Sequence, residues 1–517
     1  MSKGKWGTTG LALAGAAAVA ATAIAASGAP TGRGPSTTTD PYVLPVAPGV
    51  EVKSLVTVGD GAGATNGYRL VGIPDGLGAR KDGDGFVVYM NHELRATQGA
   101  VRAHGQAGAF VSRWRFDAKT LEAQEGADLI SSPTSVTFWD YVTATPSATP
   151  SAGGPNPRVA GDTFPAQLAA FSRFCSASFT DRGQLFNPKS KRGYDGRIYF
   201  ANEENGVEGR VFGVTEDGAA QQLPRLGLFS WENTLAAQTR GDVTLVLGQE
   251  DSADGQLWVY VGMKQKTGNA FDRAGLTNGV DYVVDLTDET VSTDAGYRTT
   301  FGKAGSAAFD LATVPWDLSG AAQNAIAKAD GLTLNRIEDG AWDPRNRNDF
   351  YFVTTEGGVG ATATRDGGGL WRLRFKDVER PWLGGSLTLL LDGSEPPLLN
   401  KPDNLDIDRH GNVLIQEDPG NNAHLARIVA YDIATGRTGV VAMFDPALFA
   451  PATPGGTDAV LTADEESSGI IDVGGILGDG WFLLDAQAHR AHPDTALVEY
   501  GQLLAMKVPS FKKVYGG

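Results

Sequence analysis

Short runs of aromatic and β-branched residues recur along the chain, and turn residues separate them. The runs span residues 86–90, 110–116, 197–200, 210–214, 243–247, 257–261, 350–353, 370–375, 413–416, 427–431, 481–484 and 502–508. Gly-Asp and Asp-x-x-Gly turns, as at 81–85 and 406–412, precede several of them. Apolar runs of this length bounded by turn residues are typical of β-strands. The pattern predicts a succession of antiparallel strands.

These strand units follow one another without the helices that a parallel sheet requires. Their spacing varies, but turns of this kind before strands are typical of blade-repeating architectures. We predict an all-β fold, namely a six-bladed β-propeller with long loop and helical insertions on one face. A large β-sandwich assembly is the alternative. The strand pattern lapses over 264–334, where Ser319 and Gly331 delimit a predicted helix at 320–329.

The N-terminal residues have a different character. Residues 1–29 have the pattern of an export signal peptide, with Lys3 and Lys5 before an Ala-rich apolar run and small residues at its end. A single membrane anchor is the alternative. Residues 30–42, rich in Thr, Ser, Gly and Pro, are expected to be flexible, and 43–517 to form a single β-propeller catalytic domain. The Pro- and Gly-rich segment 144–155 is expected to be an irregular surface loop of that domain.

Composition narrows the possible partners. The chain has 517 residues, 41% of them hydrophobic, which is enough for a large core. It carries 60 acidic against 44 basic residues, a formal charge of -16. This excess of acids argues against a nucleic-acid surface and fits either cation binding or simple solubility. With the predicted leader, we expect a monomer that is secreted, periplasmic or extracellular, without a stable membrane span in its mature form.

Acidic residues gather where the predicted strands end. The candidates are Glu93, Glu203, Glu204, Glu250, Asp251, Glu338, Asp403, Glu417, Asp418 and Glu466. Strands arranged radially would bring such acids together, and without cations they would repel one another. Carboxylate oxygens suit Ca²⁺, whereas the thiolate of Cys175, the only cysteine, suits a softer transition metal. The alternatives are acids on solvated loops and an inert buried thiol.

The segment around Arg336 and Glu338 offers both charges in one place. If the segment is extended, the strand period of two puts the guanidinium and the carboxylate on one face. A cation and an anion would then share one pocket. The alternative is a local ion pair at a strand edge, which is common and weak.

Several enzyme classes lack their sequence patterns. The six histidines have no paired zinc spacing, and neither a G-x-S-x-G elbow nor a P-loop occurs. Nucleotide-driven chemistry and serine hydrolysis are therefore unsupported. Hydrolysis that uses metal ions is the enzyme class that remains.

A set of motifs, in order, resembles the PhoX-type alkaline phosphatases between about Tyr68 and His489. The motifs are Asn91-His92-Glu93, Cys175 followed by Asn202-Glu203-Glu204-Asn205, Arg336-Ile337-Glu338-Asp339-Gly340, Lys401-Pro402-Asp403-Asn404-Leu405 leading to Gln416-Glu417-Asp418, Glu466-Ser467-Ser468-Gly469, and Asp485-Ala486-Gln487-Ala488-His489. The leader lacks the arginine pair that is frequent in this family, and no glycine pair follows Cys175. The resemblance is therefore to a divergent member.

The resemblance implies an exported six-bladed propeller whose central pocket holds iron (Fe³⁺) and calcium (Ca²⁺) and hydrolyses small phosphate monoesters. It implies that Cys175 is the thiolate on iron and that Arg336 faces the substrate phosphate. Glu93, Glu338 and an acid of the segment 249–251, assigned as Glu250, would be carboxylate ligands. Glu203, Glu204, Asp403 and Glu466 would hold calcium. A metal-bound oxide or hydroxide would attack phosphorus and release inorganic phosphate.

Two other functions remain open from the sequence. One is a different hydrolase on the same scaffold, either a phosphodiesterase or a calcium-dependent lactonase, because a fold does not fix a function. Arg336 favours phosphate over a lactone. The other is a non-catalytic propeller that binds calcium as a structural ion.

Overall fold

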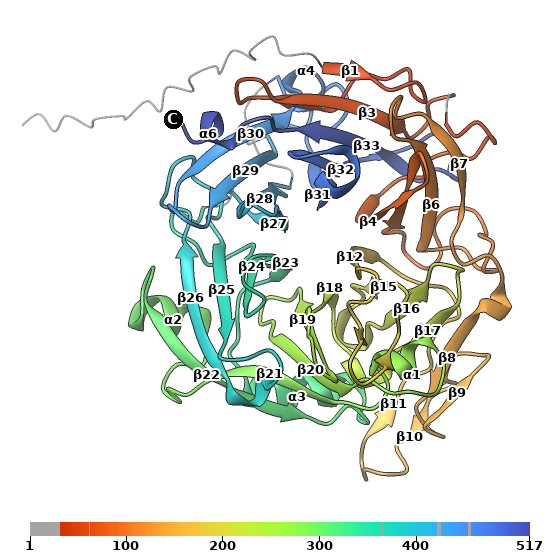
Figure 1. Cartoon of the computed structure of the whole chain (residues 1–517), viewed down its shortest axis with the longest axis vertical. Coiled ribbons are helices and arrows are strands. Elements are labelled where there is room, and N and C mark those ends of the chain that lie inside the picture. The colour runs from red at the N-terminus through yellow and green to blue at the C-terminus, as the bar shows by residue number, and fades with distance from the viewer. Residues whose placement is uncertain (1–30, 62, 363–364, 421–424, 453–455, 517) are drawn as a thin grey trace, which may run out of the picture.

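The computed structural model of the protein describes residues 31–516 except 62, 363–364, 421–424 and 453–455. Its β-sheets are arranged radially around a central axis (Figure 1). The all-β class is therefore confirmed, and the arrangement differs from two stacked sheets. The predicted signal peptide over 1–29 lies outside the described residues.

Six strands surround the axis. They are β4 (Pro74–Asp82), β12 (Phe174–Phe179), β18 (Trp231–Ala236), β23 (Ile337–Trp342), β27 (Pro402–Ile407) and β31 (Glu465–Asp472). Each contacts the next in this order, and β31 contacts β4, so that the inner strands form a closed ring (Figure 1).

Each inner strand pairs antiparallel with a second strand. These second strands are β5 (Gly85–His92), β15 (Ile198–Glu203), β19 (Val243–Glu250), β24 (Asp349–Thr354), β28 (Asn412–Glu417) and β32 (Trp481–Ala491). In five of the pairs the register shifts directly after the first residue of the inner strand, and in the β31–β32 pair it shifts between Ser468 and Ile470. Such bulges bend a strand and re-aim its side chains, here at the same level around the axis.

Further strands extend the sheets outward. They are β6 (Phe110–Asp117) and β7 (Ala123–Asp128); β16 (Val211–Thr215), β17 (Ala220–Gln222) and β8 (Val136–Asp140); β20 (Leu257–Met263), β21 (Val280–Leu286) and β22 (Ser306–Val314); β25 (Gly369–Phe375) and β26 (Gly385–Leu391); β29 (Arg427–Asp432) and β30 (Thr438–Phe444); and β33 (Glu499–Lys507). Every strand that the hydrophobic pattern predicts corresponds to an observed strand, and the bounds differ by one residue at Arg197, Arg210 and Val508. Strands β21 and β22 correct the expectation that 264–334 is purely a helical excursion, and β22 joins two sheets by pairing with β26.

The first described strands pair with the sheets formed by the C-terminal part of the chain. Strand β3 (Glu51–Thr57) lies between β33 and β1 (Thr31–Arg33) (Figure 1). Strand β2 (Val43–Pro45) pairs with β30. Arg33 also donates to Asp40 at 2.7 Å. Within the segment 30–42 that is expected to be flexible, residues 31–33 form β1, which pairs with β3.

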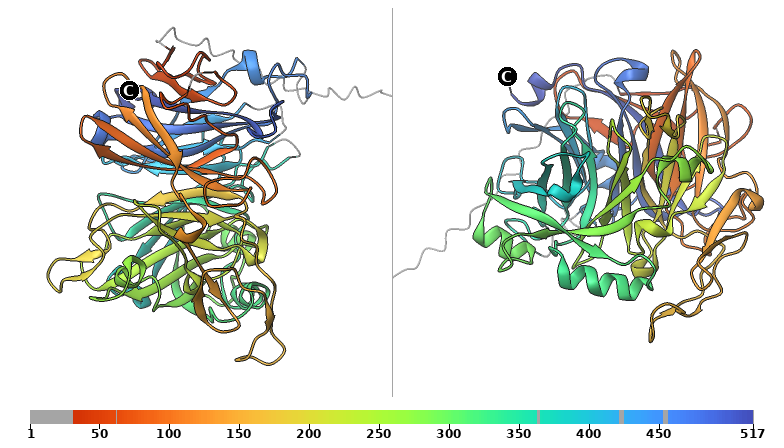
Figure 2. Two further views of the ribbon diagram at one scale, coloured as in Figure 1. Left: turned by 90° about the vertical axis from the view of Figure 1, so that its right-hand side faces the viewer. Right: turned by 60° about the horizontal axis from the view of Figure 1, so that its bottom comes forward.

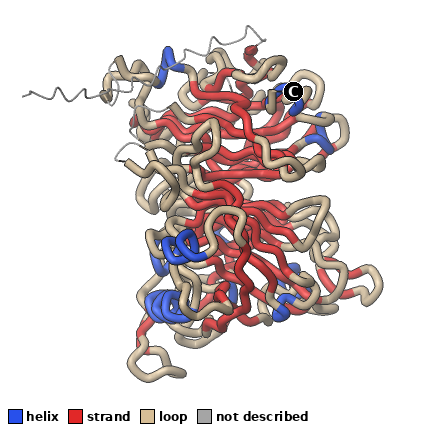
Figure 3. Tube along the Cα trace, turned by 90° about the vertical axis from the view of Figure 1, so that its left-hand side faces the viewer, coloured by secondary structure: helices blue, strands red, loops and turns tan. Residues whose placement is uncertain are grey.

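Short helices lie at the periphery of the molecule (Figures 2 and 3). They are α1 (Ala270–Ala274), α2 (Asp294–Thr300), α3 (Gly320–Asp330), α4 (Pro446–Phe449), α5 (Gly474–Leu477) and α6 (Phe511–Val514). The predicted helix is α3, and the Ser319 hydroxyl caps it by accepting from the Ala322 amide at 3.3 Å. Within the described residues, no helix combines the length and the hydrophobicity that a membrane crossing needs.

The segment 144–155 is more regular than expected. Strand β9 (Thr145–Ser147) pairs with β8 at a sheet edge, and β10 (Gly154–Pro155) pairs with β11 (Thr163–Phe164). An edge strand tolerates Pro146 because one side of its backbone needs no partner. The small strands β13 (Phe186–Asn187) and β14 (Arg192–Gly193) form a further surface hairpin.

Large apolar side chains fill the space between neighbouring sheets. Trp114, Trp231, Trp258 and Trp371 are almost completely buried. Neighbouring sheets contribute to each hydrophobic cluster; β29 and β30, for example, pack against β32 and β33. This burial stabilises the ring and holds the inner strands in fixed positions around the axis.

Candidate metal centre

The inner strands present one chemically active residue each at the same level. These residues are Asp75, Cys175, Glu232, Glu338, Asp403 and Glu466. The first five each follow the residue at which the inner strand pairs with the end of its second strand, directly before the bulge, and Glu466 follows Glu465, which pairs with Ala488. All are buried except Glu466, whose side chain is 13% exposed. Five carboxyl groups and one thiol therefore encircle the axis; we call them the inner ring.

A second set of side chains comes from the residue near the end of each second strand. These residues are Glu93, Glu204, Asp251, Thr355, Asp418 and His489. Their backbone amides donate, in order, to the carbonyls of Ile73, Arg173, Ser230, Arg336, Lys401 and Asp464 at 2.9–3.0 Å. The same backbone contact thus repeats six times, and it places four more acids beside the inner ring.

Three groups of these residues have ligand atoms that all lie within 4.8 Å of one another. They are Asp75, Glu93 and Cys175; Cys175, Glu204 and Glu232; and Glu232, Glu338 and Asp403. Cys175 belongs to two groups, and so does Glu232. The groups form one continuous set of ligands rather than three separate sites.

The electrostatics of this set call for cations. Burial, followed by the charges of neighbouring acids, raises the pKa of Asp75, Glu232, Glu338 and Asp403 well above their usual values. Burial likewise raises the pKa of the Cys175 thiol, with a smaller contribution from Asp75. Ionised acids this close together are stable only with compensating positive charge.

The donor atoms fit the expected ions. Glu232 Oε1 is buried and has no hydrogen-bond partner among the described residues, so it is available as a ligand. The group of Glu232, Glu338 and Asp403 is all carboxylate, which suits Ca²⁺. The two groups that contain Cys175 add a thiolate, which suits a transition metal such as iron.

Arg336 lies beside this set, held by two carboxylates. Its Nε and Nη2 donate to Asp251 at 2.9 and 2.8 Å, and Nη2 lies 3.0 Å from Glu338 Oε1. The expected pairing with Glu338 is present, but Arg336 precedes β23 in a left-handed conformation with φ of +55°. The shared pocket therefore arises from this backbone turn and not from an extended strand.

The structure does not bring Glu203 and Glu250 to the centre. Glu203 accepts from Arg210 Nε and Nη2 at 2.5 and 2.7 Å and from the Ser172 amide at 3.0 Å. Glu250 accepts from Trp258 Nε1 at 2.8 Å. Successive strand residues point to opposite faces, so the next residue along, Glu204 or Asp251, faces the centre instead.

Of the predicted site residues, Glu93, Cys175, Glu204, Glu338, Asp403, Glu466 and Arg336 lie at or beside the centre. Asp251 and Asp418 were candidate acids in the sequence but were not assigned as ligands, and Asp75 and Glu232 were not among the candidates. Two-residue alternation along the second strands was the signal for Asp251 and Asp418. Asp75 and Glu232 lie on inner strands that the hydrophobic pattern did not predict.

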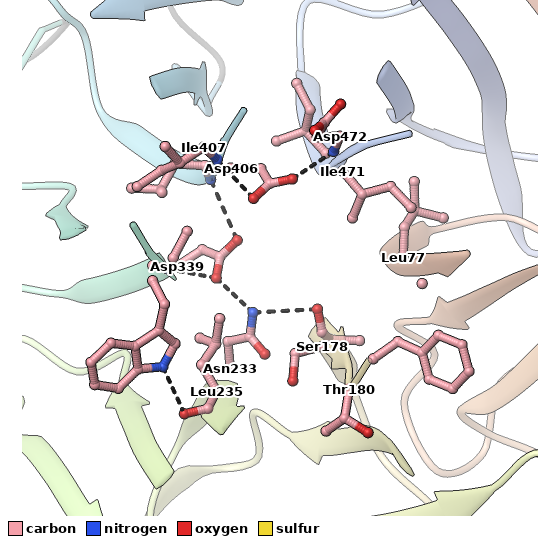
Figure 4. A pocket seen from close by; sticks show the side chains of 18 of the residues that line it. Leu77, Ser178, Thr180, Asn233, Leu235, Asp339, Asp406, Ile407, Ile471 and Asp472 are labelled. Atoms are coloured by element: carbon pink, nitrogen blue, oxygen red, sulfur yellow. Dashed lines mark hydrogen bonds between the residues drawn. The ribbon is translucent and has the colours of Figure 1, made fainter. Parts of the chain in front are cut away.

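The same inner strands line a different cavity further along their length (Figure 4). It has a volume of about 350 Å³ and contains Asp339 and Asp406 but none of the predicted metal ligands. Burial raises the pKa of both carboxyl groups to about 7. Asp339 accepts from Asn233 Nδ2 at 2.6 Å, and Asp406 accepts from the amides of Ile407 and Asp472 (Figure 4). We call this space the distal cavity.

A family model described as alkaline phosphatase PhoX matches residues 207–448 of the chain, the part that contributes Glu232, Glu338 and Asp403. This match, over a little under half of the chain, bears out the predicted resemblance to the PhoX alkaline phosphatases. It supports the predicted enzyme class, a phosphomonoester hydrolase. No curated protein sequence matches the chain.

Among solved structures, Pseudomonas fluorescens PhoX in complex with vanadate, a transition state analogue, has a similar fold. The TM-score is 0.58 at 11% identity, over 92% of this chain and 97% of that one. The α-L-arabinofuranosidase of Fusarium graminearum has a TM-score of 0.38 at 8% identity, over 85% and 94%. A gluconolactonase from Xanthomonas campestris has 0.28 at 10%, over 85% and 97%.

Proposed function

We propose that this protein is an exported phosphatase that hydrolyses small phosphate monoesters at the candidate metal centre. The observation that carries the proposal is the continuous ligand set that shares Cys175 and Glu232, with Arg336 beside it. A thiolate and several carboxylates around one space, next to a guanidinium, supply what metal-assisted transfer of a phosphoryl group to water requires.

The proposed ligands follow from the ligand groups. Cys175, with Glu204 and Glu93 on either side, would hold iron, and Glu338 and Asp403 would hold calcium. Glu232 is shared between the two kinds of group, and Asp75 completes the third. When bound, the metal ions supply Lewis acidity at the phosphate.

Arg336 would bind and orient the phosphate. A planar guanidinium offers paired donors to phosphate oxygens, and Asp251 fixes its plane through two hydrogen bonds. Because the arginine is already in place before the substrate arrives, it stabilises negative charge on the phosphoryl oxygens without reorganisation.

We also propose a propeller architecture, export and a monomeric state for this protein. The closed ring of six inner strands supports a six-bladed propeller, formed as a single domain over 43–517. Export across the membrane rests on the leader sequence over 1–29, and a monomer is proposed. The retained Arg336 favours a phosphoester over a lactone as substrate.

The decisive experiment joins metal analysis to assays. Protein purified without chelator is analysed for iron and calcium and tested on a phosphate monoester, a phosphate diester and a lactone. Iron with calcium, and a preference for the monoester, is the expected result. Calcium alone without hydrolysis would favour a non-catalytic calcium-binding protein, and a preference for the diester or the lactone would identify a different hydrolase.

A further inference from the structure

Arg173 occupies the position in its sheet that Arg336 occupies two inner strands further on. Each residue directly precedes an inner strand, β12 or β23, and each accepts the repeated backbone hydrogen bond, from Glu204 or from Thr355. Both are left-handed, with φ of +50° and +55°. This conformation is uncommon for a residue with a side chain, so the same turn aims both guanidinium groups toward the centre.

The two arginines are also held in the same way. Arg173 uses Nε and Nη2, which contact Glu93 Oε1 at 2.8 and 2.7 Å, and Nη2 also pairs with Glu204. Arg336 uses Nε and Nη2 toward Asp251 and Glu338. In both side chains Nη1 makes no hydrogen bond or ion pair with a described residue, and about a third of the side chain is exposed. Each guanidinium therefore keeps donors for a ligand.

Arginines with a purely structural place in this fold look different. Arg210 and Arg427 also form two bonds to one glutamate, Glu203 or Glu417. Their remaining donors are used as well, because Nη1 of each donates to a backbone carbonyl, that of Leu168 or Pro397. Their side chains are only 5% and 14% exposed. An arginine that serves only as the counterion of a buried glutamate therefore uses Nη1 within the protein, whereas Nη1 of Arg173 makes no hydrogen bond with a described residue.

A pocket of about 230 Å³ opens beside Arg173. Its lining includes Arg173, Glu93, Glu466, His489 and the exposed Arg95. Glu93 and Glu466 also belong to the candidate metal centre, so the pocket and the centre adjoin. Arg95 makes no ion pair with a described residue. A substrate that reaches the candidate metal centre through this pocket would pass Nη1 of Arg173.

We propose that Arg173 is a second phosphate-binding arginine, which contacts phosphoryl oxygens of the substrate from the side opposite Arg336. The two guanidinium groups flank Glu232 of the inner ring, since β18 lies between β12 and β23. Two planar donors can share the three non-bridging oxygens of a phosphate better than one can. The pocket beside Arg173 then takes the organic group of the ester. This inference rests on the proposed phosphatase function.

The test compares Arg173→Lys with Arg336→Lys and with a matched control, Arg345→Lys. Arg345 has a similarly exposed side chain, 35%, and pairs with Asp343 away from the centre. Each variant is analysed for metal content, thermal stability, kcat and KM, and inhibition by inorganic phosphate and orthovanadate. Lysine keeps the positive charge but not the planar fork.

The expected result is specific to phosphate. Arg173→Lys should keep its metals and its melting temperature while its inhibition constants for phosphate and vanadate rise by about tenfold or more and kcat/KM falls by on the order of 10²-fold. Arg345→Lys should behave like the parent. Unchanged inhibition constants, or loss of metal from Arg173→Lys, would assign Arg173 to a counterion role and overturn the proposal.

Two further measurements keep the test decisive. If Arg173→Lys does not fold, Arg173→Gln is measured in its place, and parental phosphate inhibition in that variant would also overturn the proposal. The stabilisation of metal-loaded protein by inorganic phosphate is followed as a shift in melting temperature, which needs no turnover. A parent that binds phosphate but hydrolyses no monoester would refute the proposed function alone, whereas Arg173 would still be judged by the loss of this shift.

Discussion

Two sets of acids stand side by side at the ends of the second strands, and they have opposite environments. Glu203, Glu250 and Glu417 point into the body of the fold, where arginine, tryptophan and backbone donors satisfy them. The residues that follow them, Glu204, Asp251 and Asp418, lie beside the candidate metal centre. Burial raises the pKa of Asp418 to about 7, and that of Glu204 well above its usual value.

The contrast shows how one strand end serves two purposes. Fixed donors neutralise the first set, so these acids need no ion and bind the sheet together. The second set has too few protein cations, because among the described residues only Arg173 and Arg336 form ion pairs with Glu204 and Asp251. We therefore expect the second set, and not the first, to depend on bound metal ions. Substitutions in the first set and in the second set should therefore have different consequences.

The largest effect is expected at Cys175, which belongs to two of the three ligand groups. Cys175→Ala should lose most of the iron, any visible thiolate-to-metal colour, and activity by on the order of 10³-fold, since a metal supplies several kcal/mol to such a reaction. The β content by circular dichroism should remain, because Cys175 belongs to none of the hydrophobic clusters formed by the described residues. A variant that keeps full iron and activity would show that the thiol is inert.

Glu203 and Glu204, one from each set, test this difference directly. Glu203→Gln should leave metal content unchanged but cost about 3–5 kcal/mol of stability, because it leaves the buried Arg210 without its partner. Glu204→Gln should do the reverse, losing metal and activity with a smaller change in melting temperature. Metal analysis and thermal unfolding of both variants check this, and equal metal loss from the two would contradict the assignment of faces.

The sequence predicted the outer parts of the fold better than its axis. Strands such as β5, β20 and β25 are continuous apolar runs, since both of their faces pack against other sheets. The inner strands β4 and β18 carry glycine and polar residues instead, because they line a polar axis. Hydrophobic pattern alone cannot mark such strands, so Asp75 and Glu232 were not selected.

At two strand ends the prediction of the site missed by a single residue. Acids in Glu203-Glu204 and Glu250-Asp251 are equally polar in sequence, and only the strand face separates them. The alternation of faces can be read from the sequence, but the residue at which each strand ends cannot. An error of one residue in that position exchanges the two faces. Arg173 escaped notice because its equivalence to Arg336 depends on backbone contacts between residues far apart in sequence.

A smaller effect on activity is expected when Arg336 is changed. Arg336→Lys should retain iron and calcium but lose activity by on the order of 10²-fold, because lysine cannot reproduce the planar fork. Glu338→Gln should lose metal as well, since its carboxylate belongs to a ligand group. Steady-state kinetics with metal analysis separate the two, and metal loss from Arg336→Lys would make the arginine a structural partner of Glu338.

The smallest effect should come from the distal cavity, where acids are buried without a nearby ligand group. The folded-state pKa of Asp406 is raised to about 7 by burial and the charge of Asp472, whereas in the unfolded chain it lies near 3.9. The folded protein then binds more protons between about pH 4 and 7, so this group makes the free energy of unfolding fall as pH rises through that window, by up to about 1.4 kcal/mol per pH unit. Asp406→Asn cannot titrate and should show a flatter dependence of its melting temperature on pH between 4 and 7. Parallel profiles for the parent and Asp406→Asn would mean that the distal carboxyl does not carry its proton in the folded state.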